Sequence, residues 1–214
     1  MTVRLEGFHA VKHALRFAPE LVTGVRVRNL HVARTLAQSL APDVTELLLA
    51  AATVGEVVHH TGVEATGEIP PRDSYGLTHR QEPLVLLDRP RSPGNAGAVI
   101  RVAAAAGACG VAITGPLDPW HPTVVRGSAG RHYALPVLSG TAAEVSGPIV
   151  VLDAAGDGEA LLPPHAVLVV GSERSGVSPD LRERADVVLA LPMRAGVSSL
   201  NLATATAAAL YRRR

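Results

Sequence analysis

The sequence of 214 residues is poor in cysteine, in aromatic residues and in long apolar runs. Its one cysteine, Cys109, permits no internal disulfide and no cysteine-based zinc site, so we expect a protein of the reducing cytoplasm. No apolar run approaches the roughly 20 residues of a membrane span, so no membrane partner is expected. The first twenty residues carry charges throughout, which excludes a secretory signal.

The sequence also lacks an excess of positive or negative charge, because its formal net charge is only +1. Lysine is scarce as well, since Lys12 is the single lysine among 20 basic residues. This balance decides little about partners. His59 and His60 have no acidic or cysteine neighbour, so we expect helix-end residues there and no metal. With 47% hydrophobic and 18% charged residues, the chain is typical of a globular protein of one or two domains.

Residues 1–72 predict a small α/β domain, and the polar stretch "PPRDSYGLTHRQEP" places a linker at 73–83. Apolar spacing predicts a helix in "EGFHAVKHALRFA" and another at 30–40, whereas alternation predicts a strand in "LVTGVRVR" with Arg26 and Arg28 on one face. The remaining expected elements are a strand at "ELLLA", a helix at "TVGEVVHH" and a strand near "VEATGEI".

From residue 84 to 214 the pattern becomes more regular. Five short apolar runs follow one another: "LVLLD", "GVAIT", "GPIVVL", "AVLVVG" and "DVVLALP". Runs that are apolar on both sides predict parallel strands covered by helices on both faces. Ligands of such sheets bind beyond the carboxyl ends of the strands.

The loop after the first of these runs, "RPRSPGNAGAVIRVAAAAG", offers Asn95 and Arg101. Asn95 is suited to cap a helix beginning near Ala96, and from this segment alone Arg101 is equally well read as a solvent-facing residue. The third glycine of the dinucleotide-binding fingerprint is missing, which argues against a nucleotide-dependent oxidoreductase.

Two later loops add polar groups. "VVGSERSGVSPDL" has Gly171, which would let a ligand approach the backbone, and Glu173, a lone acid among small residues; it also reads as an ordinary strand-turn-helix joint. "LPMRAGVSSLNLATATAAALYRRR" ends the chain, with Ser198 or Ser199 as the expected helix cap. Its helix shows no charge from 200 to 210, so we expect both faces to be covered.

Taken together, "PGNAGAVIRVAAAAG", "GSERSG" and "LPMRAGVSSLNLATATAAALY" resemble, in order and spacing, the three motifs of the SpoU (TrmH-like) branch of the SPOUT RNA methyltransferases. "DPWHPTVVRGSAGRHYALPV" resembles the stretch between the first and second motifs. The likeness spans 84–214. Residues 1–72, opening with "LEGFHAVKHAL", are similar to the ribosomal-protein-like RNA-binding domain that often precedes this catalytic domain.

The resemblance implies a trefoil-knotted α/β methyltransferase domain after a small α/β substrate-binding domain. Its last segment would thread through a loop, which is rare among proteins. The resemblance also implies a homodimer, S-adenosylmethionine as methyl donor, no metal, and methylation of a ribose 2'-hydroxyl in rRNA or tRNA. An RNA- or ribosome-binding protein that keeps the fold without catalysis is the alternative.

Carried over to this sequence, the family's site falls on three sets of residues. The cofactor would be held by Leu152, Asp153, Gly171, Leu191, Pro192, Met193, Ser199 and Leu200. The catalytic set would be Arg101, Asn95, Glu173, Ser199 and Asn201, whose joint presence favours an enzyme over a pure binder. RNA would be held by Arg126, Ser128, Arg26 and Arg28.

Arg101 is an awkward general base, because a guanidinium stays protonated at any ordinary pH. We therefore expect Arg101 to stabilise the negative charge that grows on the 2'-oxygen, while a phosphate or water accepts the proton.

Overall fold

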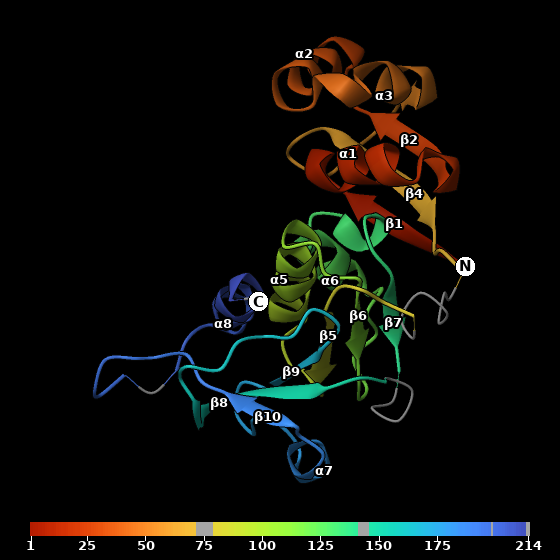
Figure 1. Cartoon of the computed structure of the whole chain (residues 1–214). Coiled ribbons are helices and arrows are strands. Elements are labelled where there is room, and N and C mark those ends of the chain that lie inside the picture. Colours follow the sequence, from red (N-terminus) through yellow and green to blue (C-terminus); the bar gives the residue numbers. More distant parts are fainter. Residues whose placement is uncertain (72–78, 141–145, 198, 213–214) are drawn as a thin grey trace.

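The computed structural model describes residues 1–71, 79–140, 146–197 and 199–212. Two sheets make up the fold, and the smaller N-terminal sheet with its helices stands above the larger one in Figure 1. Within the described chain, no helix is both long and apolar enough to cross a bilayer. The cytoplasmic location expected from the single cysteine stays a prediction.

The first domain is a four-stranded mixed sheet in the order β1-β4-β2-β3, with β4 antiparallel to both neighbours and β2 parallel to β3. Its elements in chain order are β1 (Thr2–Glu6), α1 (Phe8–Phe17), η1 (Pro19–Leu21), β2 (Val22–Val27), α2 (Leu30–Leu40), η2 (Pro42–Val44), α3 (Thr45–Ala51), β3 (Ala52–Val54) and β4 (Val63–Glu68). The sheet is therefore assembled from strands far apart in the sequence.

Two expected elements of this domain are wrong. "ELLLA" lies in helix α3, where Leu48 is buried while Leu47 is 45% exposed, because a short apolar run does not distinguish a helix from a strand. The helix expected at "TVGEVVHH" is instead strand β3 followed by a loop. His59 and His60 lie in that loop, with ring centroids 4.3 Å apart. Strand β1 was not predicted.

The second domain is a six-stranded parallel sheet in the order β10-β8-β9-β5-β6-β7. All five predicted strands are present, and β7 is additional. The elements are β5 (Leu84–Asp88), α5 (Pro93–Ala105), β6 (Gly110–Ile113), α6 (Pro122–Gly127), η3 (Arg131–Tyr133), β7 (Val137–Ser139), β8 (Ile149–Asp157), β9 (Val167–Gly171), α7 (Pro179–Glu183), β10 (Val187–Leu189) and α8 (Leu202–Tyr211). The predicted fold class is confirmed.

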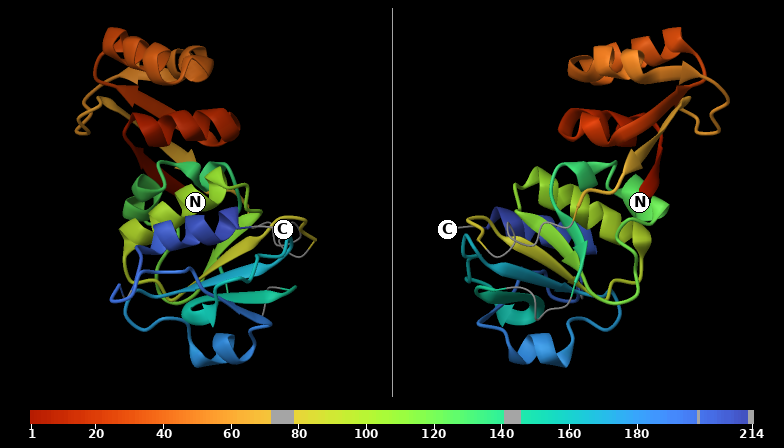
Figure 2. Two further views of the ribbon diagram at one scale, coloured as in Figure 1. Left: turned by 60° about the vertical axis from the view of Figure 1, so that its left-hand side comes forward. Right: turned by 90° about the vertical axis from the view of Figure 1, so that its right-hand side faces the viewer.

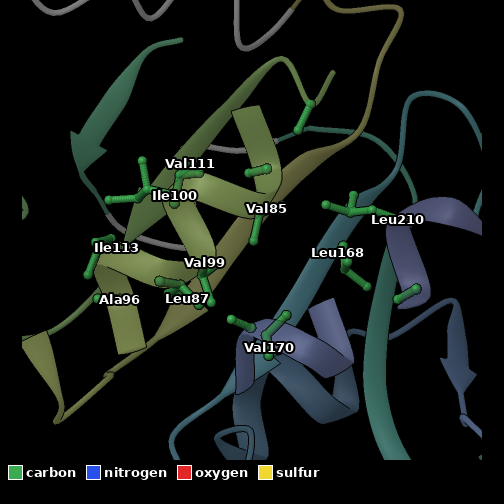
Figure 3. Packing of buried hydrophobic residues seen from close by; sticks show 14 of the residues in the cluster. Val85, Leu87, Ala96, Val99, Ile100, Val111, Ile113, Leu168, Val170 and Leu210 are labelled. Carbon is green, nitrogen blue, oxygen red and sulfur yellow. The ribbon is translucent and has the colours of Figure 1, made fainter. Parts of the chain in front are cut away.

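The strands of this sheet bury apolar side chains on both faces, as their wholly apolar runs predict. Leu87 and Leu168 belong to the face covered by α5 and α8, where they share one cluster with Val99 and Leu210 (Figure 3). The opposite face packs against α7 through Leu181. Figure 2 shows α5 and α8 between this sheet and the first domain.

Helix α8 is covered on one face only. Ala203, Thr206, Ala209 and Leu210 are buried, whereas Thr204 is exposed and Tyr211 is 71% exposed. One of the two faces expected to be covered is therefore buried within the chain, and cover on the other face stays a prediction. Arg212 fixes the end of the helix by donating to the carbonyls of Ala190 (3.1 Å) and Gly158 (2.6 Å). These bonds hold the end of the helix against the residues that directly follow β8 and β10.

The two domains share one apolar cluster, in which Trp120, Val125 and Tyr133 of the second domain join the core of the first. The Tyr133 hydroxyl donates to the Glu68 carbonyl at 3.2 Å. His13 Nδ1 lies 2.7 Å from the Ala129 carbonyl and 2.8 Å from that of His9; since both partners are acceptors, Nδ1 carries the proton. Burial lowers the pKa of His13 to about 4, so the ring is neutral.

Backbone meets backbone at the centre of this interface. Gly130 has φ of 74°, and a Cβ there would lie 2.5 Å from the Ala10 carbonyl oxygen and 2.8 Å from the Ala10 Cα. A side chain at position 130 would push helix α1 away from the second domain. Glycine is required for two reasons, one conformational and one steric.

The steric requirement can be separated from the conformational one. Gly107 has a similar φ of 70°, and a Cβ there would have no neighbour within 4 Å, so Gly107→Ala should cost only the left-handed strain, about 1 kcal/mol. Gly130→Ala adds the displacement of α1, and we expect a loss of about 3 kcal/mol. Urea unfolding of both variants measures the difference. Equal losses would show that the domain contact at Gly130 contributes nothing.

Candidate active site

A cavity of about 290 Å³ opens at the carboxyl ends of β8, β9 and β10. Three chain segments build its wall, as expected for a parallel sheet. The lining residues are Leu152, Asp153, Ala154, Val170, Gly171, Ser172, Glu173, Gly176, Val177, Leu191, Met193, Ser199, Leu200, Leu202 and Ala205. This set, here called the cofactor cavity, includes every residue predicted to hold the cofactor except Pro192. Pro192 is exposed and lies beside Gly158.

The first wall is a bulge in strand β8. On β10, adjacent Val188 and Leu189 pair with Val151 and Asp157, so residues 152–156 bulge out of the ladder. Leu152 and Asp153, which were predicted to hold the cofactor, therefore lie in an irregular part of a strand. Gly156 permits the bulge, because a Cβ there would lie 2.5 Å from the Val188 carbonyl oxygen.

Asp153, which lies in this bulge, is fixed by its own neighbourhood. Its carboxylate accepts from the Ala155 N–H at 2.9 Å and pairs with Arg182 of α7. The Ala155 hydrogen bond first, and Arg182 second, hold the pKa of Asp153 below its ordinary value despite partial burial. The carboxylate is therefore charged where it lines the cavity.

The second wall is the turn after β9. Gly171 was expected to let a ligand approach the backbone, but the close neighbour is the chain itself. A Cβ at Gly171 would lie 2.1 Å from the Gly176 carbonyl carbon and 2.3 Å from the Val177 nitrogen. Ser172 and Gly176 exchange backbone hydrogen bonds of 3.1 and 3.0 Å, which close the turn. The glycine is needed for this tight turn.

Glu173, at the tip of that turn, meets Asn95. Asn95 Nδ2 donates to Glu173 Oε1 at 2.8 Å. The expectation that Asn95 caps the helix is wrong. Helix α5 begins at Pro93, and its cap is Ser92, whose hydroxyl accepts from the Asn95 N–H at 3.3 Å. Because Ser92 fills the capping position, the Asn95 side chain is free to reach Glu173.

The ionisation of Glu173 is governed by opposing effects. Partial burial raises the pKa of its carboxyl. Hydrogen bonds from Asn95 and from the backbone of Glu173, Arg91 and Ser92 lower this pKa, and together they outweigh the effect of burial. The net pKa lies below the ordinary value. Glu173 is thus an anion held at the start of α5, where a negative charge is favoured.

The third wall precedes α8. Leu191, Met193 and Leu200 present apolar side chains, and Leu200 remains 43% exposed. The expected serine cap is wrong, because Asn201 caps α8: its Oδ1 accepts from Ala203 N at 3.0 Å and Thr204 N at 3.4 Å. Ser198 lies outside the described residues. Asn201 supports the wall without lining the cavity.

The sequence analysis did not identify Asp88, which ends β5 and binds residues that follow β6 and β9. Asp88 is buried, with 3% of its surface exposed. Its carboxylate accepts from the Ser178 N–H at 2.7 Å and from the Thr114 hydroxyl at 3.0 Å. The signal was present, since an aspartate closes an otherwise apolar strand, "LVLLD".

Arg101 does not join the cofactor cavity. It lies on α5 six residues after Asn95, which places it about 240° further around the helix. Its side chain is exposed and lines a second cavity, of about 380 Å³, between the two domains. In one chain, then, Glu173 and Ser199 line the cofactor cavity, Asn95 binds Glu173, and Arg101 faces elsewhere.

The residues predicted to hold RNA have different surroundings. Ser128 is fully buried and bonds to the Val125 carbonyl (2.9 Å) and to His132 (2.8 Å), so it is a structural residue and that prediction is wrong. Arg126 is exposed and lines the interdomain cavity. Arg28 donates to the carbonyl of Val57 at 2.5 Å and so holds its own loop.

Arg26 lies on the uncovered face of the first sheet. It contacts Glu64 at 3.3 Å, and Arg4 donates to the same carboxylate at 2.7 Å. Arg26 is exposed while Glu64 is buried. The charge of Arg26 is therefore shared with an acid of its own sheet, which weakens its case as an RNA contact.

The lowered pKa of Glu173 predicts a pH-dependent contribution to stability. A carboxyl with a depressed folded pKa stabilises the fold above its ordinary pKa of 4.5 and loses that contribution as pH falls through the lowered value. Glu173→Gln should therefore be less stable than the native chain at pH 7 and equal to it near pH 2. Urea unfolding across this range, with the exposed Glu183→Gln as control, measures the difference. A gap that persists unchanged in acid would contradict the assignment.

Known proteins of one family are similar to this chain. A family model described as the SpoU rRNA methylase family matches residues 82–211. The 23S rRNA (uridine(2479)-2'-O)-methyltransferase of Streptomyces viridochromogenes is 34% identical over 200 residues, covering 85% of this chain and 68% of that protein. The 23S rRNA (guanosine-2'-O-)-methyltransferase RlmB of Haemophilus influenzae is 30% identical over 240 residues, covering 99% of this chain and 96% of that protein.

The fold comparison agrees with the sequence comparison. The crystal structure of the SpoU methyltransferase AviRb from Streptomyces viridochromogenes, in complex with AdoMet, has a TM-score of 0.77 to this chain at 28% identity. That likeness covers 99% of this chain and 88% of the crystallised one, so it includes both domains. From the family model and the extent of these matches, the chain belongs to the SpoU rRNA methylase family.

Proposed function

We infer that this chain is an S-adenosylmethionine-dependent methyltransferase that methylates a ribose 2'-hydroxyl of ribosomal RNA. The observation that carries this function is the cofactor cavity, beside which Asn95 and Glu173 are hydrogen-bonded at 2.8 Å. Ribosomal RNA is favoured over tRNA because the two relatives described above, from Streptomyces viridochromogenes and Haemophilus influenzae, are named for 23S rRNA.

The chemistry of the cofactor cavity fits S-adenosylmethionine. Leu152, Leu191, Met193 and Leu200 supply apolar surface for an adenine ring. Among its described lining residues the only charged groups are the carboxylates of Asp153 and Glu173, which suit a cation. When bound, the donor supplies a methyl group already activated on a positively charged sulfur.

The protein's remaining task is to place the 2'-oxygen and to stabilise the charge that develops on it. Arg101 has this role, because its guanidinium remains protonated and donates to an oxyanion. A phosphate oxygen or a water molecule takes the proton. Glu173, held ionised by Asn95, orders the wall of the cofactor cavity.

For this reaction Arg101 has to lie at the cofactor cavity, but in one chain it lines the other cavity. We propose a homodimer in which Arg101 of one copy completes the site on the other. The outer face of α8 supports it, since Thr204 and Tyr211 are exposed beside half-buried Ala207 and Ala208. Small side chains permit close approach of a second copy.

Removing the guanidinium should affect transfer and spare cofactor binding. We expect Arg101→Ala to lower the transfer of tritiated methyl from S-adenosylmethionine to unmodified 23S rRNA by about 10²- to 10³-fold. Calorimetric affinity for the cofactor should stay unchanged, because Arg101 lines the other cavity. Arg34→Ala on α2 is the matched control. An Arg101→Ala enzyme with native transfer would refute the role, and binding without transfer in the native chain would support a non-catalytic RNA binder.

The dimeric arrangement can be tested by mixing two inactive variants. Arg101→Ala keeps its cofactor cavity, whereas Leu200→Asp places a carboxylate on the adenine-binding surface and keeps Arg101. After unfolding and refolding together, mixed dimers hold one complete site, so we expect about a quarter of the native activity. Each variant refolded alone serves as the control. No recovery, in a mixture shown to contain mixed dimers, would place Arg101 and the cofactor in the same chain's site.

A further inference from the structure

The second cavity, here called the interdomain pocket, lies between α1 of the first domain and α5, α6 and η3 of the second. Basic side chains converge on it from both domains: Lys12, His9, Arg101, Arg126 and Arg131. Its one described acidic lining residue, Glu6, lies 3.4 Å from Arg126 and 3.8 Å from Arg4. The pocket therefore carries a surplus of positive charge.

Three of these cations, Lys12, Arg101 and Arg131, lie close enough to repel one another, and Asp43, the acid that acts on Lys12, is paired with Arg16. Among the described residues, no carboxylate forms an ion pair with Lys12, Arg101 or Arg131. Burial first, and then the neighbouring guanidinium groups, lower the pKa of Lys12 and that of Arg131. Lys12 Nζ lies 5.9 Å from the Phe8 ring, which leaves its ammonium hydrogens available for an anion.

Arg131 adds a more specific signal. Its Nη1 is buried and has no hydrogen-bond partner in the structure. A buried, unsatisfied donor on a charged group costs about 1–3 kcal/mol or more, so such a group calls for an explanation. An anion in the pocket would satisfy it.

The backbone that positions Arg131 is strained in the same place. Ala129, which lines the pocket, has φ of 55°, and Gly130 follows with φ of 74°. A left-handed non-glycine residue costs about 1–3 kcal/mol and persists only where the surroundings fix it. Here His13 holds the Ala129 carbonyl at 2.7 Å. The strained turn thus directs Arg131 toward α1.

We propose that the interdomain pocket binds a backbone phosphate of the substrate RNA, with Lys12 and Arg131 as its ligands and Arg101 at its edge. This rests on the proposed function. A phosphodiester offers charged acceptors that match a guanidinium and an ammonium. Because Lys12 belongs to the first domain and Arg131 to the second, one phosphate bridges both domains and fixes the strand beside Arg101.

The experiment compares binding of a fluorescein-labelled 12-nucleotide single-stranded RNA by anisotropy over a range of salt concentrations. We expect Lys12→Gln and Arg131→Gln each to weaken binding about tenfold and to reduce the slope of log Kd against log salt by about one. The double variant should lose less than the product of both effects, since they share one phosphate. Arg34→Gln, an exposed charge on α2 at the far end of the first domain (Figure 1), is the matched control.

Folding and cofactor binding are monitored by thermal unfolding and by calorimetry with S-adenosylmethionine. If Arg131→Gln fails to fold, Lys12→Gln alone decides, because its ammonium is only partly buried. Unchanged affinity and salt slope in Lys12→Gln, or a loss equal to that of Arg34→Gln, would overturn the proposal. Tight calorimetric binding of inorganic phosphate that competes with the labelled RNA only weakly would also overturn it, by indicating a site for free phosphate.

The failure of this inference is distinguishable from failure of the proposed function. Native transfer of labelled methyl groups together with unaltered RNA affinity in Lys12→Gln refutes the phosphate site alone. Absence of any transfer by the native chain, with cofactor and 23S rRNA present, refutes the proposed function. Reduced RNA affinity in the two variants still supports the phosphate site in that case.

Discussion

The buried carboxylate of Asp88 is the constraint on which the catalytic domain depends. It ends β5 and accepts from Ser178 after β9 and from Thr114 after β6, so it joins the carboxyl ends of three neighbouring strands. A buried carboxylate with fewer partners would be costly, and removing any of them would loosen the others. By holding the loop after β9 toward β5, Asp88 keeps Glu173 within reach of Asn95. That contact fixes the wall of the cofactor cavity that bears Glu173.

Helix α5 separates two sites of opposite charge. Asn95 binds Glu173, whose carboxylate lines the cofactor cavity together with that of Asp153, whereas Arg101 lines the basic interdomain pocket. This separation suits the two ligands of a methyl transfer, because a sulfonium donor is positive and an RNA strand is negative. The same helix packs closely on α6 through Gly97, whose Cβ would lie 2.4 Å from the Val124 carbonyl oxygen, so the two faces are held in fixed relation.

Sequence reasoning succeeded where the signal is local or periodic. The five apolar runs are strands, and residues at the ends of three of them, β8, β9 and β10, line one cavity, because parallel strands bring their carboxyl ends together. It failed where the deciding neighbour is distant in the chain. Ser128 is sealed by His132 and Val125, and this contact leaves no pattern in the sequence. Gly171 lines the cofactor cavity, but the close backbone contact that requires a glycine there is with its own turn. Asn95 was assigned to a cap that Ser92 fills, a shift of one turn with a large consequence for Glu173.

The uncharged last helix shows how much of a composition one chain can explain. Its apolar character predicts burial, and Ala203, Ala209 and Leu210 are buried against the sheet and α5. The opposite face, with Thr204 and Tyr211, is open in one chain. A soluble surface helix normally carries charge on such a face, because water solvates charge at little cost and gains nothing from alanine. The homodimer proposed above would cover this face of alanine and threonine, and it would bring the Arg101 of a second copy to the cofactor cavity.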